Sequence, residues 1–221
     1  MPFPRPVRAV VFDMDGLLID TEKPVRAATL AAAIAVGRPM DEAFYATVIG
    51  TPWPETWARL KVFFGGEEQL TRFRAAFEAE ISGLARDLRL MAGVVELLDH
   101  LDRAGLPMAV CTSTGRDKAL LHLEKVGILS RFRHVVTRDD VTRGKPHPEP
   151  YLTAAARLGV DPADCLALED SHNGIRAAHG AGMMAVMVPD LLPATDEIKA
   201  LCHHVADDLH AVRALLARAG H

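Results

Sequence analysis

The sequence has little of several features that would place a protein in a specialised class. Its 221 residues include three cysteines and 5% aromatic residues, and the formal net charge is -4. A chain without a basic excess provides no electrostatic field for nucleic acid or for an anionic membrane surface. We therefore expect neither nucleic acid nor a membrane among its partners.

The cysteines Cys111, Cys165 and Cys202 are odd in number and show no C-x-x-C spacing, which argues against a disulfide framework and against a zinc site. Buried thiols of this kind suit a reducing cytoplasm. The opening residues 1–6 lack the apolar stretch of a secretory signal, and no segment approaches the roughly 18 uninterrupted apolar residues of a membrane span. A cytoplasmic location is therefore expected.

Nucleotide-binding signatures are also missing. Gly144-Lys145 lacks the frame of a P-loop, and no G-x-G-x-x-G follows a predicted strand. What is present is an ordinary globular composition, with 49% hydrophobic and 24% charged residues. The length suits one large domain, or one domain that carries a smaller insert.

The chain from residue 93 onward alternates between predicted helices and short apolar strands. Apolar strands are predicted at 7–12, 108–111, 134–137, 165–168 and 184–188, and helices at 94–104, 118–126, 148–158, 174–179 and 212–219. This alternation predicts an α/β fold, a Rossmann-like parallel sheet with helices on both faces. In such sheets ligands bind beyond the carboxyl ends of the strands.

Residues 21–87 interrupt that alternation with helical patterns alone. Helices are predicted at 24–36, 41–48, 54–63 and 67–87, separated by segments rich in glycine and proline. We therefore expect a core formed by residues 1–20 and 88–221 and an inserted, all-helical cap domain formed by residues 21–87.

The first strand ends in two carboxylates, Asp13 and Asp15, with Gly16 directly behind them. Side chains two residues apart on a strand share a face, and like charges held that close favour a cation between them. A lone D-x-D pattern can simply mark the end of a strand. Its significance here depends on the other strand ends.

The later strands also end in polar residues that can do chemistry. Thr112 and Ser113 follow one strand, Glu169 and Asp170 follow another, and Lys145 lies in the loop after a third. If these strands are neighbours, the groups converge on one site. Carboxylates suit Mg²⁺, while a hydroxyl, a helix amino end and an ammonium suit a phosphate. Helix capping and solvent exposure remain the alternatives for each residue taken singly.

Four segments together resemble the motifs of the haloacid dehalogenase-like superfamily, in its helical-cap branch that includes β-phosphoglucomutase and small-molecule phosphatases. They read D-M-D-G-L-L-I-D-T-E, C-T-S-T, G-K-P-H-P-E-P-Y and L-E-D-S-H-N-G-I. The resemblance covers essentially the whole core. It implies an Mg²⁺-dependent phosphoric monoester hydrolase with a Rossmann-like core.

The resemblance also implies a role for each matching residue. Asp13 would be the nucleophile that forms an aspartyl-phosphate, and Asp15 the general acid and then the general base. Asp13, the backbone carbonyl of Asp15, and Asp170 would hold Mg²⁺, with Glu169 as a ligand or just behind the ligands. Thr112, Ser113 and Lys145 would bind the phosphoryl oxygens.

Departures from the family patterns help to choose among its members. Asp15 argues against dehalogenases, which lack the second aspartate, and neither Lys23 nor Lys61 matches the Schiff-base lysine of phosphonatases. β-Phosphoglucomutases carry a cap arginine where this chain has Trp53, and a histidine where it has Val25. We therefore expect a phosphatase acting on a small phosphorylated metabolite, such as a sugar phosphate, in a monomer or small homo-oligomer. A mutase, or a silent phosphate-binding module, is the alternative.

Overall fold

The computed structural model describes residues 3–48, 53–84 and 88–220, and no helix within these ranges is long and apolar enough to cross a membrane. The chain forms two compact units. The first, which we call the sheet unit, consists of Met1–Asp20 and Arg89–His221. The second, the helical unit, is Thr21–Leu88.

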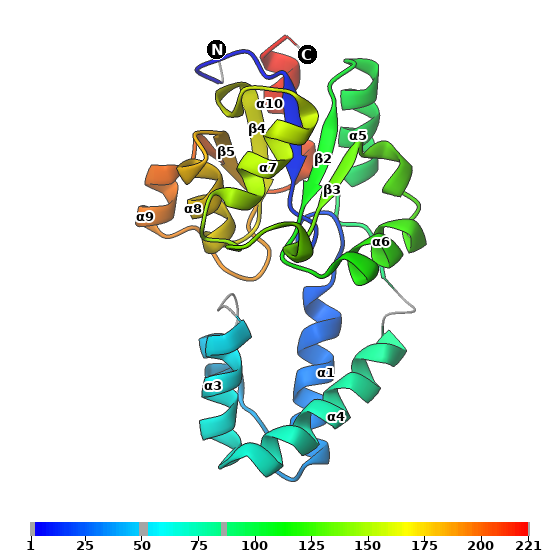
Figure 1. Cartoon of the computed structure of the whole chain (residues 1–221), viewed down its shortest axis with the longest axis vertical. Coiled ribbons are helices and arrows are strands. Elements are labelled where there is room, and N and C mark those ends of the chain that lie inside the picture. Colours follow the sequence, from blue (N-terminus) through cyan, green and yellow to red (C-terminus); the bar gives the residue numbers. More distant parts are fainter. Residues whose placement is uncertain (1–2, 49–52, 85–87, 221) are drawn as a thin grey trace. The chain divides into compact units, whose positions relative to one another are not determined.

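The sheet unit contains a six-stranded parallel sheet with the order β3-β2-β1-β4-β5-β6 (Figure 1). The strands are β1 (Ala9–Phe12), β2 (Met108–Cys111), β3 (His134–Val136), β4 (Cys165–Glu169), β5 (Met184–Met187) and β6 (His204–Val205). All four residues of β1 are fully buried, as a continuous apolar strand in the middle of a covered parallel sheet should be. The predicted Rossmann-like α/β fold is confirmed.

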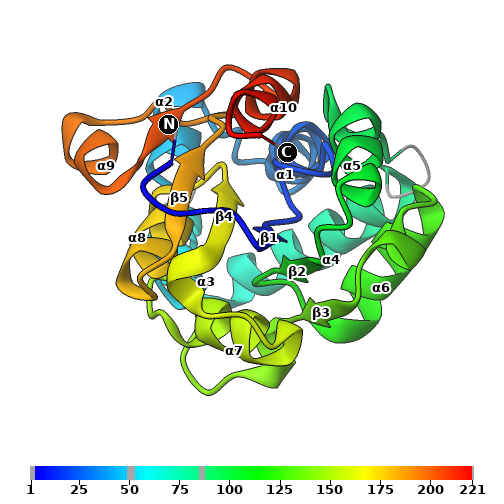
Figure 2. The same ribbon diagram turned by 90° about the horizontal axis from the view of Figure 1, so that it is seen from above.

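Helices cover both faces of this sheet. Ala9 and Val11 of β1 point to the face where α7 and α8 pack, in one apolar cluster with Tyr151 and Ile175. On the opposite face lie α5 and α10, which pack against each other (Figure 2). The helices of the sheet unit are α5 (Val94–Arg103), α6 (Arg116–Lys125), α7 (Glu149–Leu158), α8 (His172–Gly180), α9 (Asp196–Leu201) and α10 (Leu209–Arg218).

The carboxyl-terminal part of the sheet unit contains elements that the sequence pattern does not predict. Strand β6 has only two residues and α9 only six, too few for a periodic apolar pattern. Helix α10 begins at Leu209, three residues before its predicted start, because Asp208 caps it by accepting from the backbone N–H of Ala211 at 2.8 Å.

The helical unit is built around its own apolar core. Its described elements are α1 (Glu22–Ala35), α2 (Glu42–Val48), α3 (Trp53–Phe64) and α4 (Glu67–Leu84). Helices α1 and α4 pack against each other, and Phe64 stacks on Phe73 with ring centroids 4.5 Å apart. Within its described residues, the insert after the first strand is therefore helical. The Gly50-Thr51-Pro52 segment and the side chain of Trp53, on which the comparison with mutases depends, lie outside the described residues.

Candidate active site

The polar residues predicted at the strand ends lie at one edge of the sheet, because the strands that carry them are neighbours. Strand β1 lies between β2 and β4, and β3 is on the far side of β2. Asp13 directly follows β1, is 7% exposed, and donates its backbone N–H to the carbonyl of Leu168 in β4 at 2.9 Å. Gly16, with φ of +85°, then allows the chain to turn sharply.

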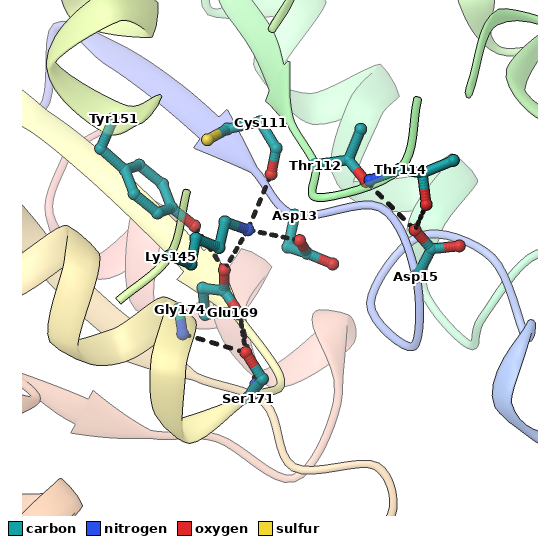
Figure 3. A network of polar contacts seen from close by, with 10 residues as sticks. All are labelled: Asp13, Asp15, Cys111, Thr112, Thr114, Lys145, Tyr151, Glu169, Ser171 and Gly174. Atoms are coloured by element: carbon teal, nitrogen blue, oxygen red, sulfur yellow. Dashed lines mark hydrogen bonds and ion pairs between the residues drawn. The ribbon is translucent and has the colours of Figure 1, made fainter. Parts of the chain in front are cut away.

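Lys145 is the centre of the buried polar network (Figure 3). Its Nζ donates to Asp13 Oδ1 at 2.5 Å, to Glu169 Oε1 at 2.5 Å and to the carbonyl of Cys111 at 2.8 Å. The side chain of Lys145 is 5% exposed. An ammonium has three protons, so these three acceptors use all of its donor capacity.

The Glu169 carboxylate is equally well satisfied although its residue is fully buried. Oε1 accepts from Lys145 and from the Tyr151 hydroxyl at 2.7 Å. Oε2 accepts from the Ser171 hydroxyl at 2.9 Å and from the Ser171 backbone N–H at 3.2 Å. Four donors fill the roughly four lone-pair positions of a carboxylate. A buried charge of this kind is stable because it is fully paired.

Gly174 in α8 lacks a side chain, which leaves room for the Glu169 carboxylate. A Cβ added at Gly174 would lie 1.8 Å from Glu169 Cδ, far inside any allowed contact. The backbone N–H of Gly174 also donates to the Ser171 hydroxyl at 3.0 Å. Only glycine fits at this position without displacing Glu169.

Asp15 belongs to a second group of contacts, beside the Lys145 network. Its Oδ2 accepts from the hydroxyls of Thr114 at 2.8 Å and Thr112 at 3.1 Å (Figure 3). Thr112 is 3% exposed, whereas Ser113 on the same loop has an exposed side chain. The structure thus turns the carboxylates of Asp13 and Asp15 toward different partners.

The loop that carries Lys145 is fixed at both ends by buried or half-buried acids. Asp140, whose side chain is 7% exposed, accepts from Arg116, from Arg157 at 2.6 Å and from the Thr137 backbone and hydroxyl. Glu149 accepts the backbone N–H of Thr142 at 2.7 Å. Lys145 is therefore aimed at Asp13 from an anchored loop.

Burial and the neighbouring charges shift the pKa values of Asp13 and Lys145. Burial raises the pKa of Asp13 well above its ordinary value; Lys145 opposes this rise, while Glu169 and Asp15 add to it. Burial alone would lower the pKa of Lys145, but Asp13 and Glu169 raise it well above its usual range. Lys145 therefore stays protonated, while the raised pKa of Asp13 means that Lys145 alone does not offset the cost of burying the Asp13 charge.

The donor set fits a hard divalent cation. Asp13, Glu169 and Asp170 each offer one carboxylate oxygen, and these oxygens lie within 4.8 Å of one another. Carboxylate oxygens are the ligands that Mg²⁺ prefers.

Sequence patterns do not reveal the residues that hold the predicted ones. Tyr151, Ser171, Gly174 and Thr114 all stand in or next to the four motifs, yet the motifs alone give them no task. Burial and Glu169 both raise the pKa of the Tyr151 hydroxyl, which keeps it a donor. In the sequence, the only signal for Tyr151 is its position: a residue with a polar hydroxyl on the apolar face of a predicted helix.

The fold and the site together define a class: an α/β enzyme whose carboxylates, hydroxyls and one ammonium meet at the carboxyl edge of a parallel sheet. Comparisons with known proteins specify the family. The family of haloacid dehalogenase-like hydrolases matches residues 10–188. The chain belongs to this family.

Individual relatives are similar over most of their length. The chain is 39% identical to a probable pseudouridine-5'-phosphatase of Drosophila melanogaster, over 84% of this chain and 83% of that protein. It is 33% identical to a phosphorylated carbohydrates phosphatase of Thermotoga maritima, over 80% and 82%. Among solved structures, a putative beta-phosphoglucomutase from Thermotoga maritima has a TM-score of 0.81 and 29% identity, over 96% of this chain and 99% of that one.

Proposed function

We propose that this chain is an Mg²⁺-dependent phosphatase that hydrolyses a small phosphate monoester of the sugar phosphate class through an aspartyl-phosphate. The observation that carries the proposal is the position of Asp13, held by Lys145 at 2.5 Å beside a second aspartate, Asp15, with hydroxyl partners. The names of two similar proteins, a pseudouridine-5'-phosphatase and a phosphorylated carbohydrates phosphatase, support the substrate class.

In the first half-reaction a carboxylate oxygen of Asp13 attacks phosphorus, and the bond from phosphorus to the alcohol oxygen breaks. Asp15 gives its proton to that leaving oxygen, so the alcohol departs neutral. Lys145 binds a phosphoryl oxygen by giving up one of its three present acceptors, and the hydroxyl of Thr112 and the loop at Ser113 bind the others.

In the second half-reaction a water molecule replaces the alcohol. Asp15, now a carboxylate, takes a proton from this water, whose oxygen attacks phosphorus. The bond from phosphorus to Asp13 breaks, which releases inorganic phosphate and restores the Asp13 carboxylate. One acid thus acts as a general acid first and as a general base afterwards.

Asp13, Asp170 and the backbone carbonyl of Asp15 would hold the Mg²⁺, which when bound neutralises phosphoryl charge that Lys145 alone cannot balance. The metal set predicted from the sequence also includes Glu169. Its two oxygens already accept from Lys145, Tyr151 and Ser171, so we assign Glu169 mainly to the orientation of Lys145.

We further propose that residues 1–20 with 88–221 are the catalytic core and that residues 21–87 are a cap that selects the substrate. The two compact units, Met1–Asp20 with Arg89–His221 and Thr21–Leu88, support this division. All the roles proposed above for the reaction fall on residues of the sheet unit. Residues of the helical unit would then determine which substrate is bound.

The test is hydrolysis of p-nitrophenyl phosphate by the purified chain with Mg²⁺, with a chelator, and with Mg²⁺ restored in excess of the chelator. We expect activity only with the metal. Asp13→Asn should lower kcat by at least about 10³-fold, since the nucleophile is lost while the shape is kept. Asp196→Asn, at a fully exposed side chain of the same unit, is the matched control and should leave kcat unchanged.

Two outcomes would overturn the proposal. Activity that is indifferent to the chelator would exclude the metal, and an active Asp13→Asn enzyme would exclude the nucleophile.

The rival function is phosphoryl transfer between sugar positions, which the similarity to a putative beta-phosphoglucomutase favours. A mutase would convert β-glucose 1-phosphate to glucose 6-phosphate with little free phosphate. A phosphatase would release phosphate from its ester and produce no isomer. Product analysis by NMR separates the two functions.

A further inference from the structure

Two threonine hydroxyls hold one oxygen of the Asp15 carboxylate. Thr114 Oγ1 and Thr112 Oγ1 both donate to Oδ2, at 2.8 Å and 3.1 Å. Figure 3 shows that the other carboxylate oxygen, Oδ1, points away from these hydroxyls. Since Oδ2 is an acceptor in both contacts, a proton on Asp15 belongs on Oδ1.

The two threonines differ in what else they do. The Thr112 hydroxyl accepts the backbone N–H of Thr114 at 3.0 Å, and the proposed reaction assigns its single proton to a phosphoryl oxygen. A hydroxyl has one proton to donate, so Thr112 must release Asp15 when it binds the phosphoryl group. Thr114 then remains as the hydroxyl donor to Asp15.

The Thr114 hydroxyl is not used for capping, the ordinary task of a threonine just before a helix. Helix α6 begins at Arg116 and its N-cap is Gly115; the backbone N–H of Arg116 donates to Asp139 Oδ2 at 2.8 Å rather than to the Thr114 hydroxyl. The Thr114 carbonyl accepts the backbone N–H of Arg138 at 3.2 Å, which fixes the loop. The loop therefore presents the Thr114 hydroxyl to Asp15 from a fixed backbone position.

We propose that Thr114 is a positioning residue for the proton transfer by Asp15, an inference that rests on the proposed phosphatase function. By donating to Oδ2, Thr114 keeps Oδ1–H directed at the leaving oxygen. As the bond from phosphorus to oxygen breaks, that proton moves from Oδ1 to the alcohol. Oδ2 stays bonded to Thr114 before and after the transfer.

This role predicts a dependence on the leaving group. An ester with a basic leaving group, such as phenyl phosphate, needs protonation by Asp15. 2,4-Dinitrophenyl phosphate releases 2,4-dinitrophenolate, a stable anion whose departure needs little protonation. Thr114→Val keeps the size and branching of the side chain but removes the hydroxyl. We expect kcat/KM, which reports the steps up to departure of the leaving group, to fall by about 10- to 100-fold for phenyl phosphate and by less than about 3-fold for 2,4-dinitrophenyl phosphate.

Matched variants separate positioning from folding. Thr114→Ser keeps the hydroxyl and should recover most of the phenyl phosphate activity. Thr71→Val makes the same replacement at an exposed threonine of α4, whose hydroxyl donates only to the Glu67 carbonyl, and should change neither rate. Asp15→Asn should give the same selectivity for the leaving group with a larger loss. Thr114→Ala also removes the hydroxyl, and its rates with both esters are measured in case Thr114→Val does not fold.

The results distinguish this inference from the function on which it rests. If the wild-type chain hydrolyses neither ester, or if Asp13→Asn keeps its activity, the phosphatase proposal fails and the role of Thr114 fails with it. If hydrolysis requires Asp13 but Thr114→Val and Thr114→Ala slow both esters equally, or slow neither, only the role of Thr114 is overturned. A selective loss on phenyl phosphate that Thr114→Ser recovers supports it.

Discussion

The carboxyl edge of the sheet and the helical unit place their charges in opposite ways. At the carboxyl edge of the sheet, the side chains of Lys145, Asp13 and Glu169 are at most 9% exposed and contact one another. In the helical unit, ion pairs join side chains that are at least 43% exposed, as in Arg26–Glu42, Arg59–Glu55 and Lys61–Glu67. The core of that unit is apolar and aromatic.

The two regions differ in the free-energy cost of burying charged groups. Burying a charge is expensive unless every partner is in place, whereas exposed pairs contribute little to stability. The buried network at the sheet edge is therefore hard to explain by stability alone, and it coincides with the groups suited to phosphoryl transfer. Substitutions in the two regions should differ accordingly.

The largest effect is expected for Lys145→Met, which leaves Asp13 and Glu169 buried without their shared cation. We expect a loss of about 4 kcal/mol in the free energy of unfolding, measured by urea titration, together with nearly complete loss of phosphatase activity. Lys61→Met, which removes the exposed pair with Glu67 in the helical unit, is the matched change and should have no measurable effect. Equal effects of the two variants would contradict the comparison.

Gly174→Ala should come next, because its Cβ would fall 1.8 Å from Glu169 Cδ. Displacing this carboxylate should cost about 3 kcal/mol in unfolding free energy and lower kcat through the misplacement of Lys145. The control is Gly180→Ala in the same helix, whose added Cβ would meet Pro148 at an ordinary 3.6 Å. A Gly174→Ala protein as stable and active as the Gly180→Ala protein would show that the Glu169 site is not tightly packed.

The residues changed in these two variants differ in whether the sequence predicts their role in the site. The sequence predicts that Asp13, Thr112, Lys145 and Glu169 meet, because each lies at the end of a strand or in the loop after one, and the carboxyl ends of neighbouring parallel strands share an edge. Their supports could not be predicted in this way. Tyr151 reaches Glu169 across 18 positions of the chain, and the need for glycine at 174 depends on a side chain in another element.

The secondary structure was likewise only partly predictable from the sequence. Apolar runs predicted five strands and the helical insert, because long periodic patterns reflect burial. Strand β6 and helix α9 are too short to carry such a pattern, and their formation depends on packing beside β5 and α8.

A smaller and pH-dependent effect is expected at Asp140, which anchors the loop of Lys145. Burial alone would raise the pKa of Asp140, but hydrogen bonds from Arg157 and Thr137 hold it well below its ordinary value of 3.8. The ionised form therefore favours folding: its contribution is complete above about pH 5 and is lost as the pH falls below 3.8.

Asp140→Asn should cost about 2 kcal/mol at pH 7, and the difference from wild type should shrink as the pH falls from 5 toward 3. Urea unfolding across this range measures it. A difference that stays constant with pH would mean that the charge of Asp140 does not contribute to the anchor.

The smallest effect is expected for Tyr151→Phe, which removes one of the four donors to Glu169 and leaves the packing intact. We expect a loss of about 1.5 kcal/mol in unfolding free energy and a modest fall in kcat with little change in KM. Tyr45→Phe, at a buried tyrosine of the helical unit, provides the comparison for phosphatase activity. A fall in kcat of the same size in both variants would indicate a general loss of stability rather than a role for Tyr151 at the site.

The central claim, that Asp13 accepts the phosphoryl group, can be tested by trapping the intermediate. The chain is mixed with p-nitrophenyl phosphate and Mg²⁺, quenched in acid during turnover, and treated with borohydride, which reduces an acyl phosphate to an alcohol. We predict that peptide mass spectrometry will find homoserine in place of aspartate at position 13 only when ester was present. Turnover with Asp13 unmodified, or with the reduced residue elsewhere in the chain, would contradict the account.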